Sequence, residues 1–99
     1  SVKSPNDKIR VLREEVLIPL GLSANGLARD LRVPVTRINE ILHGRRAITA
    51  DTALRLARYL GTTAQYWMNL QTSHDLKVAE RARGKRMERE ILARKPRAA

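Results

Sequence analysis

One short segment of the chain gathers side chains that could recognise a DNA duplex. Its polar members are Thr36, Arg37, Asn39 and Glu40. Arginine can bond guanine through two parallel hydrogen bonds, asparagine can bond adenine in the same way, and glutamate can accept from cytosine. The basic pair Arg45-Arg46 follows, where its charges could neutralise phosphates. These residue types predict a surface that reads base edges and holds the flanking backbone.

Each of these groups also has a plainer interpretation. Arg37 and Asn39 could be ordinary solvated helix surface, and the arginine pair could be a solvated charge cluster. Glu40 could orient Arg37 or Arg45 instead of contacting a base. We nevertheless favour DNA contact, because the groups lie together on the second helix of a two-helix pattern.

That pattern consists of two short helices joined by a tight turn. The first is expected to run from a cap at Ser23 to about Leu31, and the second from about Pro34 to Leu42. Gly44 is placed as a left-handed terminator. The residues expected to fill the wedge between the two helices are Leu27, Val33, Ile38 and Ile41, and the small Ala28 is expected where the two backbones approach. Two helices crossing at a sharp angle in this way predict a helix-turn-helix unit that binds double-stranded DNA.

Three further helices are predicted around this unit. One covers about residues 9–19 and ends at Gly21. Another is capped by Thr49 or Asp51 and closed by Gly61, and the last starts after Thr63 and runs towards residue 78. Because Phe is absent and only one Trp and two Tyr occur, the core must be mainly aliphatic. The sequence therefore predicts an all-α fold of five helices.

Charge is distributed unevenly along the 99 residues, whose formal net charge is +10. Residues 81–99 hold eight of the 20 basic groups and two of the 10 acidic groups, which leaves only +4 for residues 1–80. We therefore divide the chain into an irregular lead-in (1–8), a helical domain (9–80) and a basic tail (81–99). Helical spacing of Met87, Ile91 and Leu92 predicts a tail helix over about 80–94, with Gly84 as its weak point. Such a surplus of positive charge favours nucleic acid first and an anionic membrane second.

Other function classes find little support. There is no cysteine, and the two histidines, His43 and His74, show no metal-ligand spacing. Glu14 and Glu15 are adjacent and point in different directions on a helix, so they cannot act as a catalytic pair. No glycine-rich phosphate loop, secretory leader or stretch long enough to span a bilayer is present. We expect a cytoplasmic protein that is not an enzyme and has no cofactor or membrane partner.

Over about residues 11–80 the chain resembles the HigA-type antitoxins of bacterial toxin–antitoxin modules. These belong to the Xre, or lambda-repressor-like, helix-turn-helix superfamily. The sharpest mark is Tyr66-Trp67-Met68-Asn69-Leu70-Gln71. The other motifs that carry the resemblance are Leu12–Glu15, Pro19–Ser23 and Arg37–Thr63.

The resemblance implies a homodimer that binds a palindrome in its own promoter and represses its operon. It also implies that the protein neutralises a small RelE-like (HigB-type) endoribonuclease toxin by direct contact. By position, the groups that would contact bases are Val35, Thr36, Arg37 and Glu40, to which the residue types add Asn39. The groups that would contact phosphates are Ser23, Asn25, Arg45 and Arg46. Relatives usually have glycine in the turn where this chain has Arg32, so a positive φ there would strain the backbone by about 1 kcal/mol and Arg32→Gly should stabilise the fold.

Alternatives remain open at this point. The chain could be a stand-alone or phage-type repressor without a toxin, or a protein-binding module whose helix-turn-helix is vestigial. Trp67, Leu70 and Tyr66 are expected in the core or the dimer interface rather than in a base-stacking platform. The basic tail could be a DNA arm, a toxin-binding segment or a solvated run.

Overall fold

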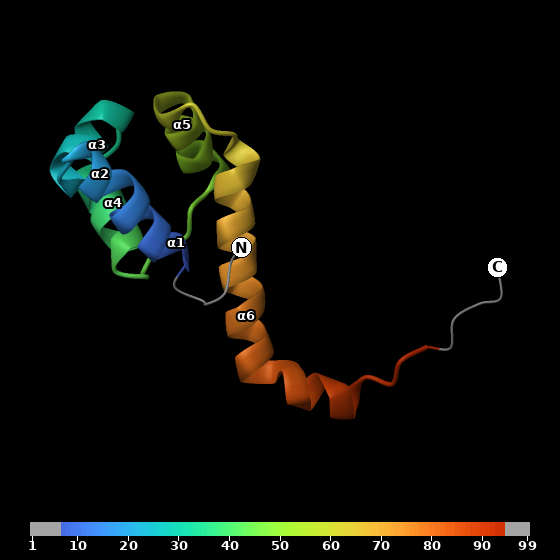
Figure 1. The fold of residues 1–99 in the computed structure, drawn as a ribbon. Coiled ribbons are helices and arrows are strands. Elements are labelled where there is room, and N and C mark those ends of the chain that lie inside the picture. The colour runs from blue at the N-terminus through green and yellow to red at the C-terminus, as the bar shows by residue number, and fades with distance from the viewer. Residues whose placement is uncertain (1–6, 95–99) are drawn as a thin grey trace, which may run out of the picture.

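The computed structural model describes residues 7–94, which form five helices and no strand. The first helix comprises three consecutive elements, α1 (Asp7–Arg10), η1 (Val11–Leu17) and α2 (Ile18–Leu20). The others are α3 (Ala24–Leu31), α4 (Val35–Leu42), α5 (Ala50–Leu60) and α6 (Ala64–Glu90). Figure 1 shows α6 standing beside the other helices and extending well beyond them. The predicted all-α fold is confirmed.

Most helix ends lie where the sequence placed them. The hydroxyl of Ser23 accepts a hydrogen bond from the Gly26 amide at 3.0 Å, so Ser23 caps α3. Thr49 rather than Asp51 caps α5, and Thr63 caps α6. The glycines that terminate helices have positive φ, as expected: Gly21, Gly44 and Gly61. These ends depend on a few neighbouring residues, which is why the local sequence predicts them.

The turn between α3 and α4 is formed by a left-handed arginine. Arg32 has φ 61° and is the only non-glycine residue with positive φ between residues 7 and 94. Its amide and that of Val33 donate to carbonyls of the last turn of α3, the Val33 amide bonding Ala28 at 3.0 Å. The condition set for Arg32 in the sequence analysis, a positive φ, is therefore met.

The first helix differs from the prediction in its start and its hydrogen bonding. It begins at Asp7 rather than Ile9, and the expected irregular lead-in before Asp7 lies outside the described residues. Its central stretch is π-helical, and the Ile18 amide bonds the carbonyl of Arg13, five residues earlier. Pro19 has no amide hydrogen, so the carbonyl four residues before it cannot receive the usual helical bond. The periodicity of apolar residues does not reveal such a wider turn.

The core is aliphatic apart from one indole ring, as predicted. Trp67 is 1% exposed and belongs to a buried cluster to which every helix contributes residues. The largest apolar side chains buried with it are Leu12, Leu27, Ile38, Ile41, Ile48 and Leu56. Burial of α3 and α4 on this core orients the faces that remain outside.

A buried polar cluster joins three distant segments at Gln71. The Gln71 carbonyl oxygen accepts from Lys8 Nζ at 2.8 Å and from the Ile48 amide at 2.7 Å. Its amide nitrogen donates to Asp75 at 2.8 Å. Lys8 is only 2% exposed, and burial lowers the pKa of its ammonium, an effect that the charge of Asp75 opposes. The cluster ties the start of the chain to α6 and to the loop before α5.

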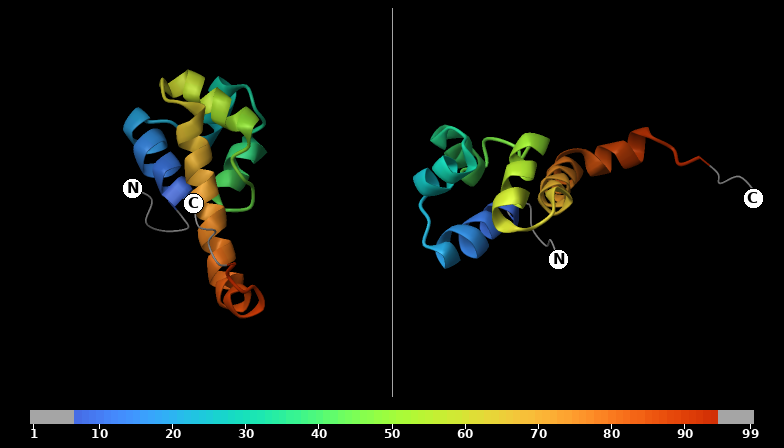
Figure 2. Two further views of the ribbon diagram at one scale, coloured as in Figure 1. Left: turned by 90° about the vertical axis from the view of Figure 1, so that its right-hand side faces the viewer. Right: turned by 90° about the horizontal axis from the view of Figure 1, so that it is seen from above.

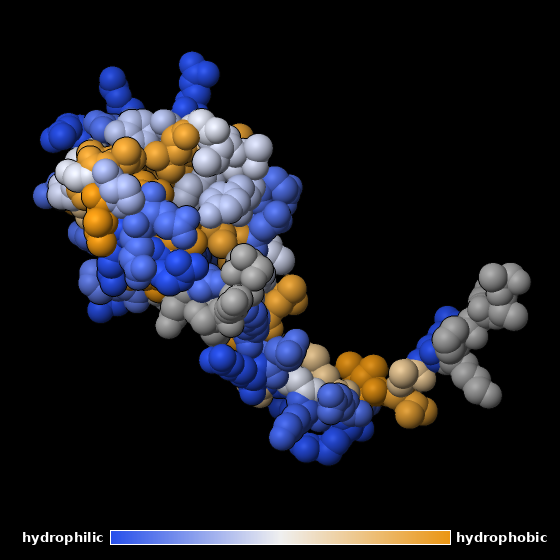
Figure 3. Space-filling view, in the orientation of Figure 1, coloured by the Kyte–Doolittle hydropathy of each residue, from blue (hydrophilic) through white to orange (hydrophobic). Residues whose placement is uncertain are grey.

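The C-terminal half of α6 leaves the globule. The helix runs without interruption past Glu80 and ends at Glu90, so the predicted fifth and tail helices are one element. All three ribbon views show this part projecting into solvent, with a bend near its end (Figures 1 and 2). Large apolar side chains remain exposed on it, among them Leu76, Met87, Ile91 and Leu92, and Figure 3 shows apolar residues along the projection. We call residues 76–94 the arm.

None of the helices within residues 7–94 combines the length and the apolar composition that crossing a membrane requires.

Candidate nucleic-acid interface

Helix α4 presents one face to the core and the opposite face to solvent. Ile38, Ile41 and Leu42 are buried against the rest of the helical bundle. Because helical residues three and four apart share a face, Thr36 and Asn39 lie on the outer side, and both are exposed. Val35, another predicted base-contacting residue, is half-buried and packs against the core. Only the exposed edge of its side chain could contact a base.

Arg37 is the one predicted base-contacting residue that is bound to another helix. Its Nη1 donates to Oδ2 of Asp51 in the first turn of α5 at 2.8 Å, and its side chain is 27% exposed. Arg55 Nε donates to the same oxygen at 2.9 Å. Arg55 and then Arg37 hold the pKa of the Asp51 carboxyl below its usual value by their hydrogen bonds. The carboxylate therefore remains charged and keeps Arg37 close to α5.

Glu40 pairs with Arg46, one turn beyond the end of α4. The distance from Arg46 Nε to the Glu40 carboxylate is 2.7 Å. The sequence offered Arg37 or Arg45 as partners for Glu40, and neither pairs with it. Arg45 is exposed, and within residues 7–94 its side chain has no hydrogen bond or ion pair. Of the two arginines, Arg45 has the freer charge for a phosphate.

The start of α3 lies beside the turn that leads from the first helix. Ser23 uses its hydroxyl to cap this end, while Asn25 is exposed in the first turn. Amides at a helix start point outward and favour an anion such as a phosphate. Both predicted residues thus occupy a position that fits backbone contact.

Comparison with known proteins places this geometry in a family. Residues 12–67 match the helix-turn-helix family. The addiction module antidote protein of the HigA family from Coxiella burnetii is 43% identical, with a TM-score of 0.87, and the match covers 93% of this chain and 100% of that one. The chain belongs to the HigA-type antitoxins.

Two further relatives extend this comparison. The Pseudomonas aeruginosa antitoxin HigA, solved with the higBA promoter, is 42% identical with a TM-score of 0.83, and the match covers 91% of this chain and 95% of that one. Virulence-associated protein I of Dichelobacter nodosus is 61% identical over 70 residues. That match covers 71% of this HigA-type chain and 65% of the relative.

The aromatic mark of the HigA resemblance lies partly inside and partly outside the core. Trp67 and Leu70 are buried, and Trp67 Nε1 donates to the Thr62 hydroxyl at 2.8 Å. Tyr66 is 40% exposed and meets Trp67 edge to face, with ring centroids 5.1 Å apart. Partial burial, followed by the charge of Glu15, raises the pKa of the Tyr66 phenol.

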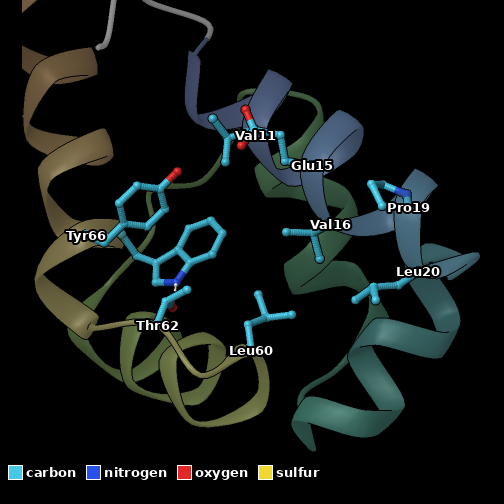
Figure 4. A pocket seen from close by; sticks show the side chains of 9 residues that line it. Val11, Glu15, Val16, Pro19, Leu20, Leu60, Thr62 and Tyr66 are labelled. Carbon is cyan, nitrogen blue, oxygen red and sulfur yellow. Dashed lines mark hydrogen bonds between the residues drawn. The ribbon is translucent and has the colours of Figure 1, made fainter.

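Tyr66 borders a groove between the first helix and the start of α6. The groove has a volume of about 430 Å³, and its walls are mainly apolar. Figure 4 shows the side chains that line it: Val11, Glu15, Val16, Pro19, Leu20, Leu60, Thr62 and Tyr66. Trp67 also lines the groove. Leu20 is more than half exposed at its edge. The groove is a candidate for protein contact rather than for DNA, because it presents little positive charge.

No group of three or more His, Asp or Glu side chains that could hold a metal ion is found in the described part of this HigA-type chain. One ring nitrogen of His43 lies 2.7 Å from the carbonyl oxygen of Asn39 within its own helix end.

The sequence did not reveal the residues whose side chains form hydrogen bonds between different helices. Asp51 was considered only as a cap, although its spacing of four residues from Arg55 signals an ion pair on one helix face. Nothing in the sequence pointed to its bond with Arg37. The contact between Lys8 and Gln71 was not expected, because burial of a charged residue such as Lys8 depends on segments far apart in the chain.

Proposed function

We propose that this protein is a dimeric antitoxin that represses its own operon and neutralises a RelE-like, HigB-type endoribonuclease toxin. The outer face of α4 carries the proposal: Thr36 and Asn39 are exposed on the helix that a helix-turn-helix protein inserts into the major groove. A HigA relative was solved with the higBA promoter, and this supports DNA binding by the present chain. Such a protein would act in the cytoplasm, where its DNA and its toxin meet.

In this proposal, contacts on α4 and around it have separate roles. Base edges are read by Val35, Thr36, Arg37, Asn39 and Glu40, while Ser23, Asn25, Arg45 and Arg46 hold phosphates. Two copies related by twofold symmetry engage half-sites about one DNA turn, roughly 34 Å, apart. Occupying the promoter would repress transcription.

The DNA part is tested by comparing Arg37→Ala with Arg45→Ala on the promoter duplex and on a random duplex. Arg37→Ala should relax sequence preference, since it removes a base contact, while its affinity for random DNA changes little. Arg45→Ala should weaken both duplexes alike and lower the slope of log affinity against log salt by about one unit. Equal losses on both duplexes for Arg37→Ala would contradict its role in reading bases.

The groove beside Tyr66 is our candidate for the contact between the two copies. Leu20 and Tyr66 expose apolar surface there, and none of the residues that line the groove is a proposed DNA contact. Leu20→Glu should shift the protein from dimer to monomer in sedimentation and weaken promoter binding. Leu54→Glu is the matched control, because Leu54 is also more than half exposed but lies outside the groove, and this change should leave the dimer intact.

The toxin part is tested by co-expression with the small open reading frame next to the gene. If the neighbour arrests growth alone, and growth returns when this protein is present in a stable complex, the antitoxin proposal holds. If the neighbour is harmless and does not bind, the protein is a stand-alone repressor.

The arm is basic, so it should bind the negatively charged DNA more readily than it would bind a basic toxin. We therefore assign the arm to DNA within this proposal. Removing residues 81–99 should then lower the salt slope.

A further inference from the structure

We propose that Asp51 is a specificity-determining positioning residue, whose carboxylate holds the Arg37 guanidinium in the orientation needed to read a base. The inference rests on the proposed DNA-binding function. It concerns a residue on α5, outside the recognition helix.

A single carboxylate oxygen connects Arg37 to α5. Asp51 Oδ2 accepts from Arg37 Nη1 at 2.8 Å and from Arg55 Nε at 2.9 Å. Within residues 7–94 the bond between Arg37 and Asp51 is the only side-chain hydrogen bond that joins α4 to α5. Arg37 therefore has a fixed contact at one of its five N–H groups, and the others stay available for a ligand.

The acceptor itself is fixed from behind. Arg55 Nη1 donates to the carbonyl oxygen of Leu31 at 2.9 Å and to that of Arg32 at 3.4 Å, at the turn between α3 and α4. Asp51 also lies in the first turn of α5, where a negative charge is favourable. The chain of contacts from Arg37 through Asp51 and Arg55 returns to the turn that positions α4. The guanidinium is thus held relative to the backbone of the whole helix-turn-helix unit.

This arrangement should raise specificity by two routes. A free arginine loses side-chain entropy when it binds a base, and an arginine that is already oriented loses less. The second route is electrostatic, because Asp51 neutralises a charge that would otherwise attract any phosphate. The first route strengthens operator binding, and the second weakens binding to random DNA.

The decisive variant is Asp51→Asn, which keeps the shape of the side chain and removes its charge. Affinity should be measured on the promoter duplex and on a random duplex across a range of salt concentrations. We expect the ratio of the two affinities to fall about tenfold, in line with the value of one bidentate base contact. Affinity for random DNA should be unchanged or higher, with a salt slope steeper by up to about one unit. Asp51→Glu should restore part of the ratio.

Asp30→Asn is the matched control. Asp30 borders the same shallow hollow as Asp51, but its carboxylate accepts from the Tyr59 hydroxyl at 2.6 Å and has no hydrogen bond or ion pair to α4 within residues 7–94. Removing its charge should change the affinities for the promoter duplex and the random duplex by the same factor and leave their ratio unchanged. A fall of the ratio in Asp30→Asn as large as in Asp51→Asn would overturn the proposal, because charge alone would then explain it.

The double variant Arg37→Ala with Asp51→Asn separates positioning from scaffolding. If Asp51 acts through Arg37, Asp51→Asn should not change the ratio further once Arg37 is absent. An equal fall of the ratio in both backgrounds would contradict this, as would equal losses on both duplexes accompanied by a lower Tm. If the wild-type protein does not distinguish its promoter from random DNA, the proposed function fails. If the wild-type protein distinguishes its promoter from random DNA and the Asp51→Asn variant does so equally well, only the proposed role of Asp51 fails.

Discussion

In α6, residues 64–75 pack against the core, whereas residues 76–90 continue the same helix into solvent. The first half contributes Trp67, Leu70 and Gln71 to the interior. In the second half no residue is buried, and its charged side chains include the Arg86–Glu90 pair, 2.8 Å apart. The two halves of this continuous helix are therefore stabilised in different ways.

The difference separates tertiary packing from local helix preference. The first half is held by burial, which stabilises it regardless of the helix propensity of its residues. The arm is rich in Ala, Arg, Glu and Lys, which favour a helix without any partner. We therefore expect changes in the first half to alter global unfolding, and changes in the arm to alter only the local helix content.

Trp67→Ala should have the largest effect. Removing a buried indole leaves a cavity and should destabilise the fold by about 3–5 kcal/mol, lowering Tm by more than about 10 °C. Met87→Ala in the arm, where the side chain is exposed, should change the free energy of unfolding by less than about 0.5 kcal/mol. Thermal unfolding followed by circular dichroism measures both. A comparable fall for Met87→Ala would show that another molecule buries the arm.

Gln71→Leu should have the next largest effect. It removes the oxygen that accepts from Lys8 and from the Ile48 amide, and two buried donors without this acceptor should destabilise the fold by about 2–3 kcal/mol. Gln65→Leu is the control on the same helix, since Gln65 is exposed and bonds only Asn69 among the described residues. Urea unfolding should separate the two variants, and equal midpoints would contradict the role of the buried cluster.

Arg32→Gly should stabilise the globule by up to about 1 kcal/mol, because glycine adopts a positive φ without strain. Arg29→Gly, an exposed position inside α3, should destabilise it by a similar amount. The opposite signs would be seen in urea midpoints, while the helix content of the arm stays unchanged. A loss of stability in Arg32→Gly would show that the arginine side chain outweighs the backbone strain.

Gly84→Ala should have the smallest effect on the whole protein. An added Cβ would meet only Glu80 Cγ at 3.4 Å, so the arm helix should gain roughly 0.5–1 kcal/mol locally. Slower amide exchange around residue 84 with an unchanged Tm is the expected result. Gly26→Ala places the same change in the packed globule, where Ser23 Oγ would lie 3.4 Å away, and should raise Tm instead. If both variants raise Tm equally, the arm unfolds together with the core.

Much of the fold follows from short-range patterns in the sequence. Ser23 and Thr63 cap their helices through bonds to residues three positions on. The left-handed turn at Arg32 was suggested only by the family resemblance, because relatives usually have glycine there. The exposure of Thr36 and Asn39 follows from the helical period of their apolar neighbours. Such features need only a few adjacent residues.

What the sequence did not reveal depends on how the helices meet. The bond between Arg37 and Asp51 spans 14 positions, and the bond between Lys8 and Gln71 spans 63. Periodicity shows which face of a helix is buried but not which residue of another helix lies opposite. The π-helical stretch was missed for a different reason, because a change from four- to five-residue bonding hardly alters the apolar pattern.

The buried cluster at Gln71 also bears on the order of events in folding. Contacts between α3 and α4 join residues close in sequence, and such contacts form early because little chain entropy opposes them. The Gln71 oxygen joins segments 23 and 63 residues away, so it can accept both hydrogen bonds only after the first helix has reached α6. On a ribosome, a nascent chain that ends before Gln71 would already contain both helices of the DNA-reading unit. The closing step of folding would then be the docking of the amino-terminal helix onto α6.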